Sequence, residues 1–345
     1  MRSTPSLSIS NSKSYRKVFL KIVIFSAIFF VVNYWIGLKL ENVADRKDIY
    51  ATVKWEEFYE TSHNTIDLVF LGSSYSYRSF DPEVFDNELN TNSFNMGSPL
   101  QKPVESYYIL KETLKYQKPS LVVFDMNWGV FNKDEYFNTK LWNYDSMKFS
   151  ANKLGYLLNV FDQEQYFNAL FKSMRYHDDM DKLIKPLLGI NVQTKSEKDV
   201  QAYLKNYKGK GFIINNDLVD VNSIEKKFEN AKKNPKTYKW DKRQLKYLDK
   251  IVKLCEKENI ELVLVTAPLA PTYLEEYNAH WYDYDEIHEA ANEIAENYGL
   301  KYFDYNVINK AENIVTDTDF ADTNHLNYDG AQKISFYLVQ LIKMR

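Results

Sequence analysis

The stretch Ile66–Arg78, which reads IDLVFLGSSYSYR, decides the fold that the sequence predicts. Its apolar run, Leu68–Leu71, ends abruptly in the small-residue turn Gly72-Ser73-Ser74. This pattern is typical of a buried strand that runs into a tight turn. In open α/β sheets, ligands bind beyond the carboxyl ends of the strands. A serine in this turn is therefore placed to present its hydroxyl at the sheet edge, although a purely structural polar turn has the same pattern.

The far end of the chain supplies the groups that such a serine needs. The segment Phe320–Ala331 reads FADTNHLNYDGA and precedes a predicted helix over 331–344. Asp322 and His325 are three residues apart, so one short turn can hold the carboxylate against the imidazole. A serine hydroxyl becomes a nucleophile when a base takes its proton, and a third group orients that base. Ser74, His325 and Asp322 are thus the candidate catalytic residues.

Strand and helix patterns alternate between these two ends. Val104–Tyr116 has apolar residues at helical spacing. Asp81 and Pro82 suit the N-cap and first position of another helix. The sequence predicts buried strands at Ile66–Leu71, Thr91–Met96, Pro119–Asp125, Ile260–Thr266 and Leu300–Tyr305. Such alternation indicates an α/β fold with a parallel sheet and crossover helices.

The motifs resemble those of the SGNH (GDSL-like) hydrolases. The first block of that family is a Gly-x-Ser after the first strand, which Gly72-Ser73-Ser74 matches, and the last is Asp-x-x-His, which Asp322 and His325 match. The resemblance implies a flavodoxin-like, three-layer α/β/α sandwich and a nucleophile at Ser74.

The two middle blocks of the same family imply an oxyanion hole. Asn95-Met96-Gly97 fits the second block and assigns a backbone donor to Gly97. The third block reads Asp125-Met126-Asn127-Trp128, where the family usually has Gly-x-Asn-Asp, and it assigns a side-chain donor to Asn127. The N–H groups of Ser74 and Gly97 and the Asn127 amide would then bind the oxyanion, and no cofactor is implied.

A long apolar segment, Val18–Leu38, lies near the N-terminus and reads VFLKIVIFSAIFFVVNYWIGL. About 20 apolar residues cross a bilayer core as a helix. Arg16 and Lys17 precede the segment, which predicts a cytoplasmic N-terminus and an extracytoplasmic domain. A cleaved signal peptide is the alternative, but no A-x-A-like site follows. A buried core helix is disfavoured because the run is apolar on all sides.

These patterns predict five parts of the chain. The predicted parts are a cytoplasmic N-terminus (1–17), a transmembrane anchor (18–38), a linker (39–65), an SGNH-like core (66–128 and 237–345) and an insertion or cap (129–236). The insertion is mostly helical and dense in aromatic residues, which we expect mainly to form its own small core, although some could stack on sugar rings. Trp128 follows Asn127 directly and is the candidate for lining a substrate pocket.

Composition narrows the function further. The 345 residues carry a formal net charge of −3, which gives no indication of nucleic-acid binding. Cys255 is the only cysteine, and its apolar helical surroundings favour core packing. His280 and His288 lie among acidic residues, but their spacing is not that of a compact metal site, so we expect no metal.

The anchor and the motifs together suggest a role in the cell envelope. The chain resembles membrane-anchored SGNH proteins that O-acetylate exopolysaccharides or assist D-alanylation of teichoic acids beside a multi-span membrane acyltransferase. This resemblance implies an extracytoplasmic serine acyltransferase or acylesterase that acts on a cell-envelope polysaccharide or teichoic acid. Two alternatives remain: a carbohydrate esterase that uses water as acceptor, and a catalytically idle protein that binds the polymer.

Overall fold

The computed structural model describes residues 12–44, 49–133, 136–191, 201, 204–231 and 233–344. By internal contacts the chain divides into two units. Met1–Lys47 and Gln163–Ser196 form the N-terminal unit, and Asp48–Asp162 with Glu197–Arg345 form the α/β unit. The insertion predicted over 129–236 is therefore shared between the units, since its residues 163–196 group with the N-terminal helix.

The α/β unit contains a sheet of five parallel strands in the order β2-β1-β3-β6-β7. This is the flavodoxin-like strand order, in which the direction of strand addition across the sheet reverses between β1 and β3. The strands are β1 (Leu68–Leu71), β2 (Ser93–Asn95), β3 (Leu121–Asp125), β6 (Glu261–Thr266) and β7 (Lys301–Asp304). The predicted α/β class and parallel sheet are thus confirmed.

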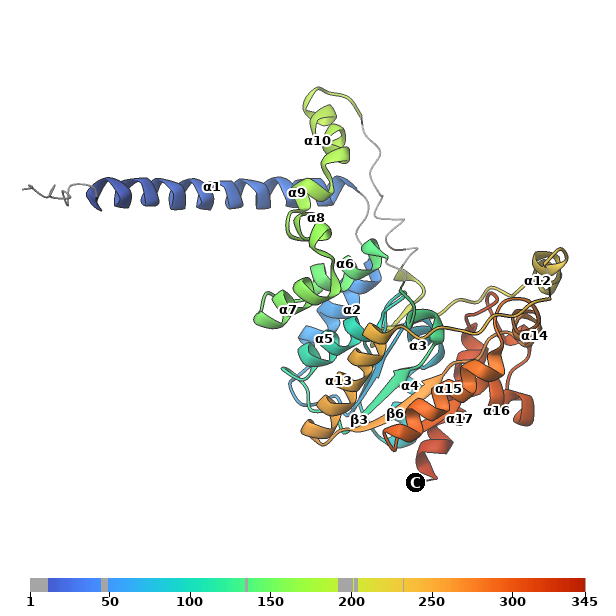
Figure 1. The fold of residues 1–345 in the computed structure, drawn as a ribbon. Coiled ribbons are helices and arrows are strands. Elements are labelled where there is room, and N and C mark those ends of the chain that lie inside the picture. The colour runs from blue at the N-terminus through green and yellow to red at the C-terminus, as the bar shows by residue number, and fades with distance from the viewer. Residues whose placement is uncertain are drawn as a thin grey trace, which may run out of the picture. The chain divides into compact units, whose positions relative to one another are not determined.

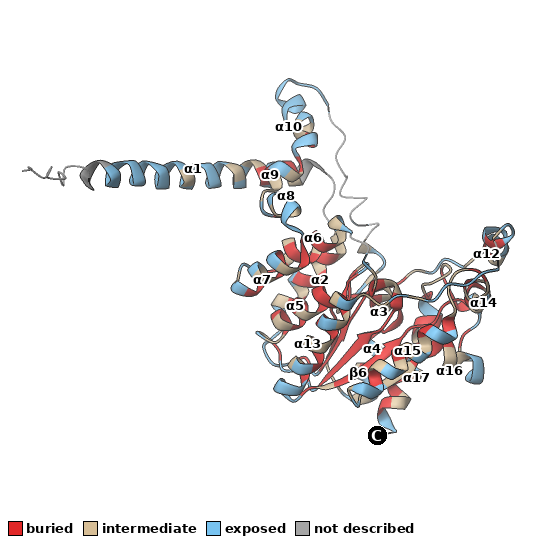
Figure 2. Ribbon diagram, in the orientation of Figure 1, coloured by how far each residue is buried: buried red, intermediate tan, exposed pale blue. Residues whose placement is uncertain are grey.

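Helices cover both faces of this sheet (Figure 1). One face packs against α4 (Pro82–Leu89), α15 (Tyr284–Asn297) and α17 (Tyr328–Lys343). Figure 1 shows α5 (Pro103–Thr113) and α13 (Lys242–Glu258) on the opposite side. Because successive strand residues point to opposite faces, the alternating buried residues of β1, β3 and β6 supply both interfaces, and Figure 2 shows these strands as buried.

Shorter elements complete the α/β unit. They are α2 (Ile49–Glu60), α3 (Ser74–Ser79), α6 (Phe137–Ser146), α7 (Ala151–Val160), β4 (Tyr207–Gly209), β5 (Phe212–Ile213), α12 (Val221–Phe228), α14 (Pro271–His280) and α16 (Tyr305–Glu312). Helix α2 lies in the segment predicted as a linker, and its Trp55 and Phe58 are fully buried. Much of that segment therefore belongs to the core of the unit.

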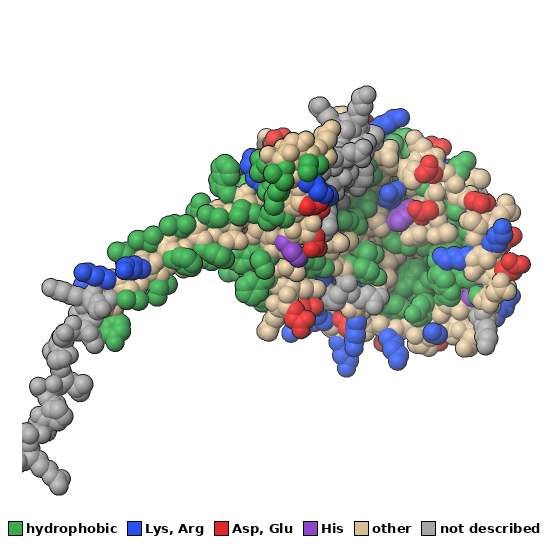
Figure 3. All heavy atoms as spheres, turned by 90° about the horizontal axis from the view of Figure 1, so that it is seen from above, with side chains coloured by type: hydrophobic (Ala, Val, Ile, Leu, Met, Phe, Trp, Pro, Cys, Tyr) green, Lys and Arg blue, Asp and Glu red, His purple; other side chains and the backbone are tan. Residues whose placement is uncertain are grey.

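The N-terminal unit is built on α1 (Ser12–Ala44). Within α1, Tyr15–Glu41 is long and apolar enough to cross a membrane, and the most apolar 18-residue window of this stretch has no buried residue, although Leu40 near its end is buried. Figure 3 shows hydrophobic side chains along this helix and basic ones near its N-terminal end. The short helices α8 (Tyr166–Leu170), α9 (Lys172–Arg175) and α10 (Met180–Leu187) belong to the same unit.

Candidate active site

The turn after β1 places Ser74 at the carboxyl end of the sheet. Gly72 has φ +143°, and a Cβ at this position would lie 2.3 Å from the Cβ of Asp125, so the turn requires glycine. Ser73 is the N-cap of α3, and its Oγ accepts a hydrogen bond from the N–H of Tyr75. Ser74 is consequently the first residue of α3, directly after the sheet edge.

Ser74, His325 and Asp322 form a continuous row of hydrogen bonds. The Oγ of Ser74 lies 2.8 Å from Nε2 of His325, and Nδ1 of His325 lies 2.9 Å from Oδ2 of Asp322. When Nδ1–H donates to the carboxylate, Nε2 is left to accept the serine proton. The structure thus brings together the three residues that the sequence singled out, across 251 positions of the chain.

A tight turn shapes the acid–histidine pair. Oδ1 of Asp322 accepts hydrogen bonds at 2.9 Å from the backbone N–H groups of Asn324 and His325. Burial alone would raise the pKa of Asp322, but the His325 ring and these two donors lower it below its usual range. The Asp322 side chain is 48% exposed and that of His325 is 18% exposed. The carboxylate is therefore held ionised beside a ring that substrate can reach.

The predicted oxyanion donors differ in their present partners. Nδ2 of Asn127 is buried and has no hydrogen-bond partner among the described residues. The N–H of Ser74 likewise meets no acceptor in the described part of the chain, as expected for a first-turn amide. The N–H of Gly97, in contrast, donates at 3.0 Å to Oδ1 of Asn95. Two of the three donors are thus available to a new acceptor, whereas Gly97 would have to share its hydrogen.

Asp125 and Asn95 support this arrangement, and the sequence reading gave neither of them a role. Oδ2 of Asp125 accepts hydrogen bonds from the Oγ (2.7 Å) and N–H (3.3 Å) of Ser73, while Oδ1 accepts from the N–H of Asn127 (3.0 Å). Burial raises the pKa of Asp125 to about 6. Asn95 donates to the carbonyls of Ser76 and Phe80. The sequence signal that could have identified both residues is that each is a polar residue at the end of an apolar strand.

Aromatic side chains surround the site. The ring of Tyr75 lies 5.5 Å from that of His325, centroid to centroid. Trp128, predicted to line a pocket, is only 5% exposed. Its Nε1 donates at 2.7 Å to the hydroxyl of Tyr277, and its ring packs edge-on against Tyr284. Trp128 therefore belongs to the packed core in this structure, and its substrate-binding role stays a prediction.

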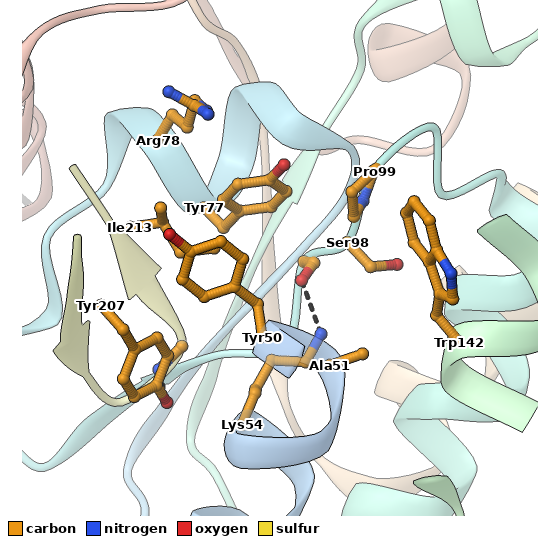
Figure 4. A pocket seen from close by; sticks show the side chains of 12 residues that line it. Tyr50, Ala51, Lys54, Tyr77, Arg78, Ser98, Pro99, Trp142, Tyr207 and Ile213 are labelled. Carbon is orange, nitrogen blue, oxygen red and sulfur yellow. Dashed lines mark hydrogen bonds between the residues drawn. The ribbon is translucent and has the colours of Figure 1, made fainter. Parts of the chain in front are cut away.

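A cavity of about 110 Å³ lies beside Gly97 within the α/β unit (Figure 4). Figure 4 shows the rings of Tyr50, Tyr77, Tyr207 and Trp142 around it. Nζ of Lys54 donates at 2.6 Å to the carbonyl of Gly97, the contact that Figure 4 draws as a dashed line.

Arg78 also lines the cavity, and its position is chemically unusual. Its Nε and Nη1 atoms are buried and have no hydrogen-bond partner among the described residues. Arg78 follows Ser74 by four residues within α3, and positions i and i+4 share one face of a helix. The cavity therefore begins about one helical turn from the candidate nucleophile and has a cationic lining.

Two of the other histidines have hydrogen-bond partners within the fold, and Cys255 is buried. Nδ1 of His288 lies 2.8 Å from Oδ2 of Asp304, and Nδ1 of His280 lies 2.9 Å from the Glu276 carbonyl. In the described ranges, no group of three His, Cys, Asp or Glu side chains could hold a metal ion. Cys255 is buried in α13, and burial raises the pKa of its thiol to about 12.

Two solved structures are similar to the chain at low identity. One is a proposed acylhydrolase from Bacteroides fragilis NCTC 9343, with 12% identity and a TM-score of 0.39, covering 84% of this chain and 93% of that chain. The other is a GDSL-like lipase from Bacteroides thetaiotaomicron VPI-5482, with 10% identity and a TM-score of 0.39, covering 86% of this chain and 99% of that chain.

No curated protein in the comparison matches the chain. The model of the family DUF1574, described as a protein of unknown function, matches residues 18–340, and with this extent of match the chain belongs to the DUF1574 family.

Proposed function

We propose that the protein is a serine esterase or O-acyltransferase of SGNH type. The observation that carries the proposal is the hydrogen-bonded row from Ser74 through His325 to Asp322, at 2.8 and 2.9 Å. A nucleophile, a base and a group that orients the base are the minimum set for acyl transfer through a covalent intermediate. Their convergence at the carboxyl end of a flavodoxin-like sheet, where ligands bind, supports the assignment.

The mechanism follows from the positions of these groups. His325 takes the proton of Ser74 at Nε2 while Oγ attacks the ester carbonyl, and Asp322 stabilises the resulting imidazolium. The N–H of Ser74 and Nδ2 of Asn127 donate to the oxyanion. The N–H of Gly97 also donates, while it shares its hydrogen with Oδ1 of Asn95. His325 then returns the proton to the departing alkoxide. An acceptor hydroxyl, or water, attacks the acyl-serine with the same base.

The cavity lined by Arg78 is the proposed subsite for the acyl acceptor. Aromatic rings suit the faces of sugars, and two buried guanidinium nitrogens without partners are costly unless an anionic ligand group pairs with them. Its place about one turn beyond Ser74 puts a bound acceptor close to the acyl-serine. We therefore favour a sugar or polyol polymer that carries carboxylate or phosphate groups.

The apolar helix α1 supports a place at the cell envelope. If α1 spans the membrane, the basic residues Arg16 and Lys17 keep its N-terminus in the cytoplasm and leave the α/β unit outside. A tethered acyltransferase acts on a polymer that stays at the membrane, such as an envelope polysaccharide or a teichoic acid. A multi-span membrane acyltransferase is the proposed source of the acyl group.

Labelling with a fluorophosphonate serine probe tests the proposed chemistry. We expect the full-length protein in detergent to be labelled at Ser74, as located by peptide mass spectrometry. Ser74→Ala and His325→Ala should abolish labelling, whereas Ser73→Ala should retain part of it, because Ser73 only supports the turn. A folded wild-type protein that resists the probe would contradict the proposal and favour an idle polymer-binding protein.

Transfer and hydrolysis are separated by adding acceptors. The acceptors are glycerol phosphate and glucuronate, and 4-nitrophenyl acetate is the acyl donor. An acyltransferase forms the acetylated acceptor and releases correspondingly less free acetate, whereas a hydrolase releases free acetate only. Product ratios from mass spectrometry decide between them. Loss of both reactions in Ser74→Ala is the control that assigns them to this site.

A further inference from the structure

We propose that residues 163–190 insert into the outer half of the lipid bilayer beside α1 and form a second membrane-binding element. The proposal rests on the proposed function in one respect, namely that α1 spans the membrane. It concerns the N-terminal unit alone, in which Phe171, α9 and α10 pack against α1 and α8 packs beside Phe171. The proposed occupant of the exposed face of these helices is lipid.

The contacts between the two segments follow the outer half of the apolar span. The ring of Phe171 lies 6.3 Å from that of Phe29 and 5.9 Å from that of Phe30. Oγ of Ser173 donates at 2.8 Å to Oδ1 of Asn33. These partners on α1 all precede Leu38, the predicted end of the apolar run.

The register of these contacts fixes the depth of α9. A helix rises about 1.5 Å per residue, so Phe29 lies roughly 14 Å and Asn33 roughly 8 Å below Leu38. The hydrocarbon core is about 30 Å thick. A side chain that packs on Phe29 therefore reaches close to the bilayer centre, whereas the Ser173 backbone lies beside Gly37, near the outer end of the apolar run. At the outer end, Nζ of Lys172 bonds Glu41 at 2.7 Å, beyond Leu38.

A polar pair inside the apolar span supports this position. Nδ2 of Asn33 donates to the carbonyl of Phe29 at 2.9 Å, and its Oδ1 accepts from Ser173. An amide in hydrocarbon requires such partners, because no water is present to replace them. Gly37 allows the close approach, since a Cβ there would lie 2.9 Å from Cβ of Lys172.

Many apolar side chains of this segment are exposed, beside exposed charged residues such as Asp178, Asp181 and Lys185. Phe167 is 67% exposed and Leu187 is 82% exposed. Other exposed apolar side chains of this segment are Leu170, Met174, Ile184, Leu188 and Ile190. Soluble surfaces rarely gather so many exposed apolar residues in so short a segment, and such gathering marks a membrane or protein contact.

Helix α10 has the pattern of an interfacial helix. Its Met180 and Leu183 pack near Ile36 and Leu40 at the outer end of the span. It also carries Lys182 and Lys185, which form ion pairs with Asp179 at 2.7 Å and with Asp181 at 2.5 Å. Apolar and charged side chains on one short helix suit the headgroup boundary of a membrane. The continuity with the α1 span favours lipid over a protein partner.

Depth-dependent quenching tests the proposal on the full-length protein. Cys255 is buried with a raised thiol pKa, so single cysteines introduced as Phe167→Cys, Leu170→Cys or Leu187→Cys can be labelled with NBD. The labelled proteins are reconstituted in vesicles of phosphatidylcholine and phosphatidylglycerol (3:1). We expect blue-shifted NBD emission and at least twofold quenching by lipid nitroxides. Shallow nitroxides should quench the label at position 187, and deeper nitroxides should quench the label at position 167.

Two control sites separate this proposal from the anchor itself. A label at Phe25→Cys in α1 should be quenched by deep nitroxides, and one at the exposed Lys257→Cys on α13 should not be. Quenching at 25 without quenching at 167, 170 and 187 would overturn the second membrane-binding element and leave the anchor and the proposed function intact. Absence of quenching at 25 would overturn both the anchor and the second membrane-binding element. Matched circular dichroism of each variant excludes misfolding as the cause.

Discussion

The carboxylate of Asp125 lies beneath the turn that presents Ser74. It binds the N-cap residue Ser73 with one oxygen and the backbone of Asn127 with the other. One buried side chain thereby holds the nucleophile turn and a candidate oxyanion donor in fixed positions. Its raised pKa, about 6, means that the folded protein binds a proton there which the unfolded chain, with an ordinary pKa of 3.8, has released.

This difference predicts a pH dependence of stability. Between about pH 4 and pH 6 the folded state holds more protons at Asp125, so its contribution to the free energy of unfolding falls as pH rises. We expect wild type to lose up to about 3 kcal/mol relative to Asp125→Asn between pH 4 and pH 7. Denaturant unfolding at several pH values measures this, with the half-exposed Asp249→Asn as control. Parallel pH profiles for wild type and Asp125→Asn would contradict it.

Gly72 adopts the positive φ that the same turn requires. Alanine there meets both an unfavourable positive φ and the Cβ of Asp125 at 2.3 Å. We expect Gly72→Ala to destabilise the protein by about 2–4 kcal/mol and to lower fluorophosphonate labelling strongly. Gly299→Ala is the matched control, because Gly299 also has positive φ (+65°) but open space around its Cβ. Equal effects at the two positions would show that the contact with Asp125 is unimportant.

At the scale of elements, the α-helices of the α/β unit begin where local chemistry indicates. Asp241 caps α13, and its Oδ1 accepts from the N–H groups of Arg243 and Gln244. Asp81 caps α4 in the same way. The Asp81 cap was predicted from the sequence, because a short acidic side chain before an apolar helical pattern satisfies amides that no helical carbonyl can reach.

The cap of α13 gives a prediction at this scale. Asp241→Ala should lower the free energy of unfolding by about 1 kcal/mol and leave labelling of Ser74 unchanged, since α13 contributes no group to the site. Glu256→Ala, an exposed residue near the end of the same helix, serves as the control and should change stability by less than about 0.5 kcal/mol. Thermal unfolding compares the three proteins.

The α3 helix offers a prediction about substrate. Arg78→Gln keeps a hydrogen-bonding side chain but removes the charge, so we expect the KM for a phosphate- or carboxylate-bearing acceptor to rise about tenfold or more. Labelling of Ser74 and the KM for neutral glycerol should stay near wild type. An equal change in KM for charged and neutral acceptors would show that Arg78 supports the fold instead of reading the acceptor charge.

At the scale of the whole molecule, the fold brings two distant parts of the chain into one site. Ser74 and His325 are 251 residues apart and act as a unit. Their effects on acyl transfer should therefore not add. We expect Ser74→Ala and His325→Ala each to lower kcat by about 10⁴-fold or more, and the double variant to be no worse than either alone. Additive losses, measured with 4-nitrophenyl acetate, would mean that the two residues act separately.

The sequence by itself determined the local elements and the α/β class. The acidic caps and the short apolar strands act through neighbouring residues, so their pattern can be recognised without the fold. The mostly helical pattern of the predicted insertion was less informative over residues 151–175. The structure breaks this stretch into α7, η2 (Gln163–Gln165), α8 and α9, and its later part packs against α1.

Only the tertiary structure decided which distant groups meet. The support of Ser73 by Asp125 and the burial of Trp128 against Tyr277 each depend on strand register and packing between segments far apart in sequence. The packing of Phe171 and Ser173 on α1 likewise follows from a contact across about 140 residues. Local propensity carries no information about such contacts, because their free energy arises only when the whole chain is folded.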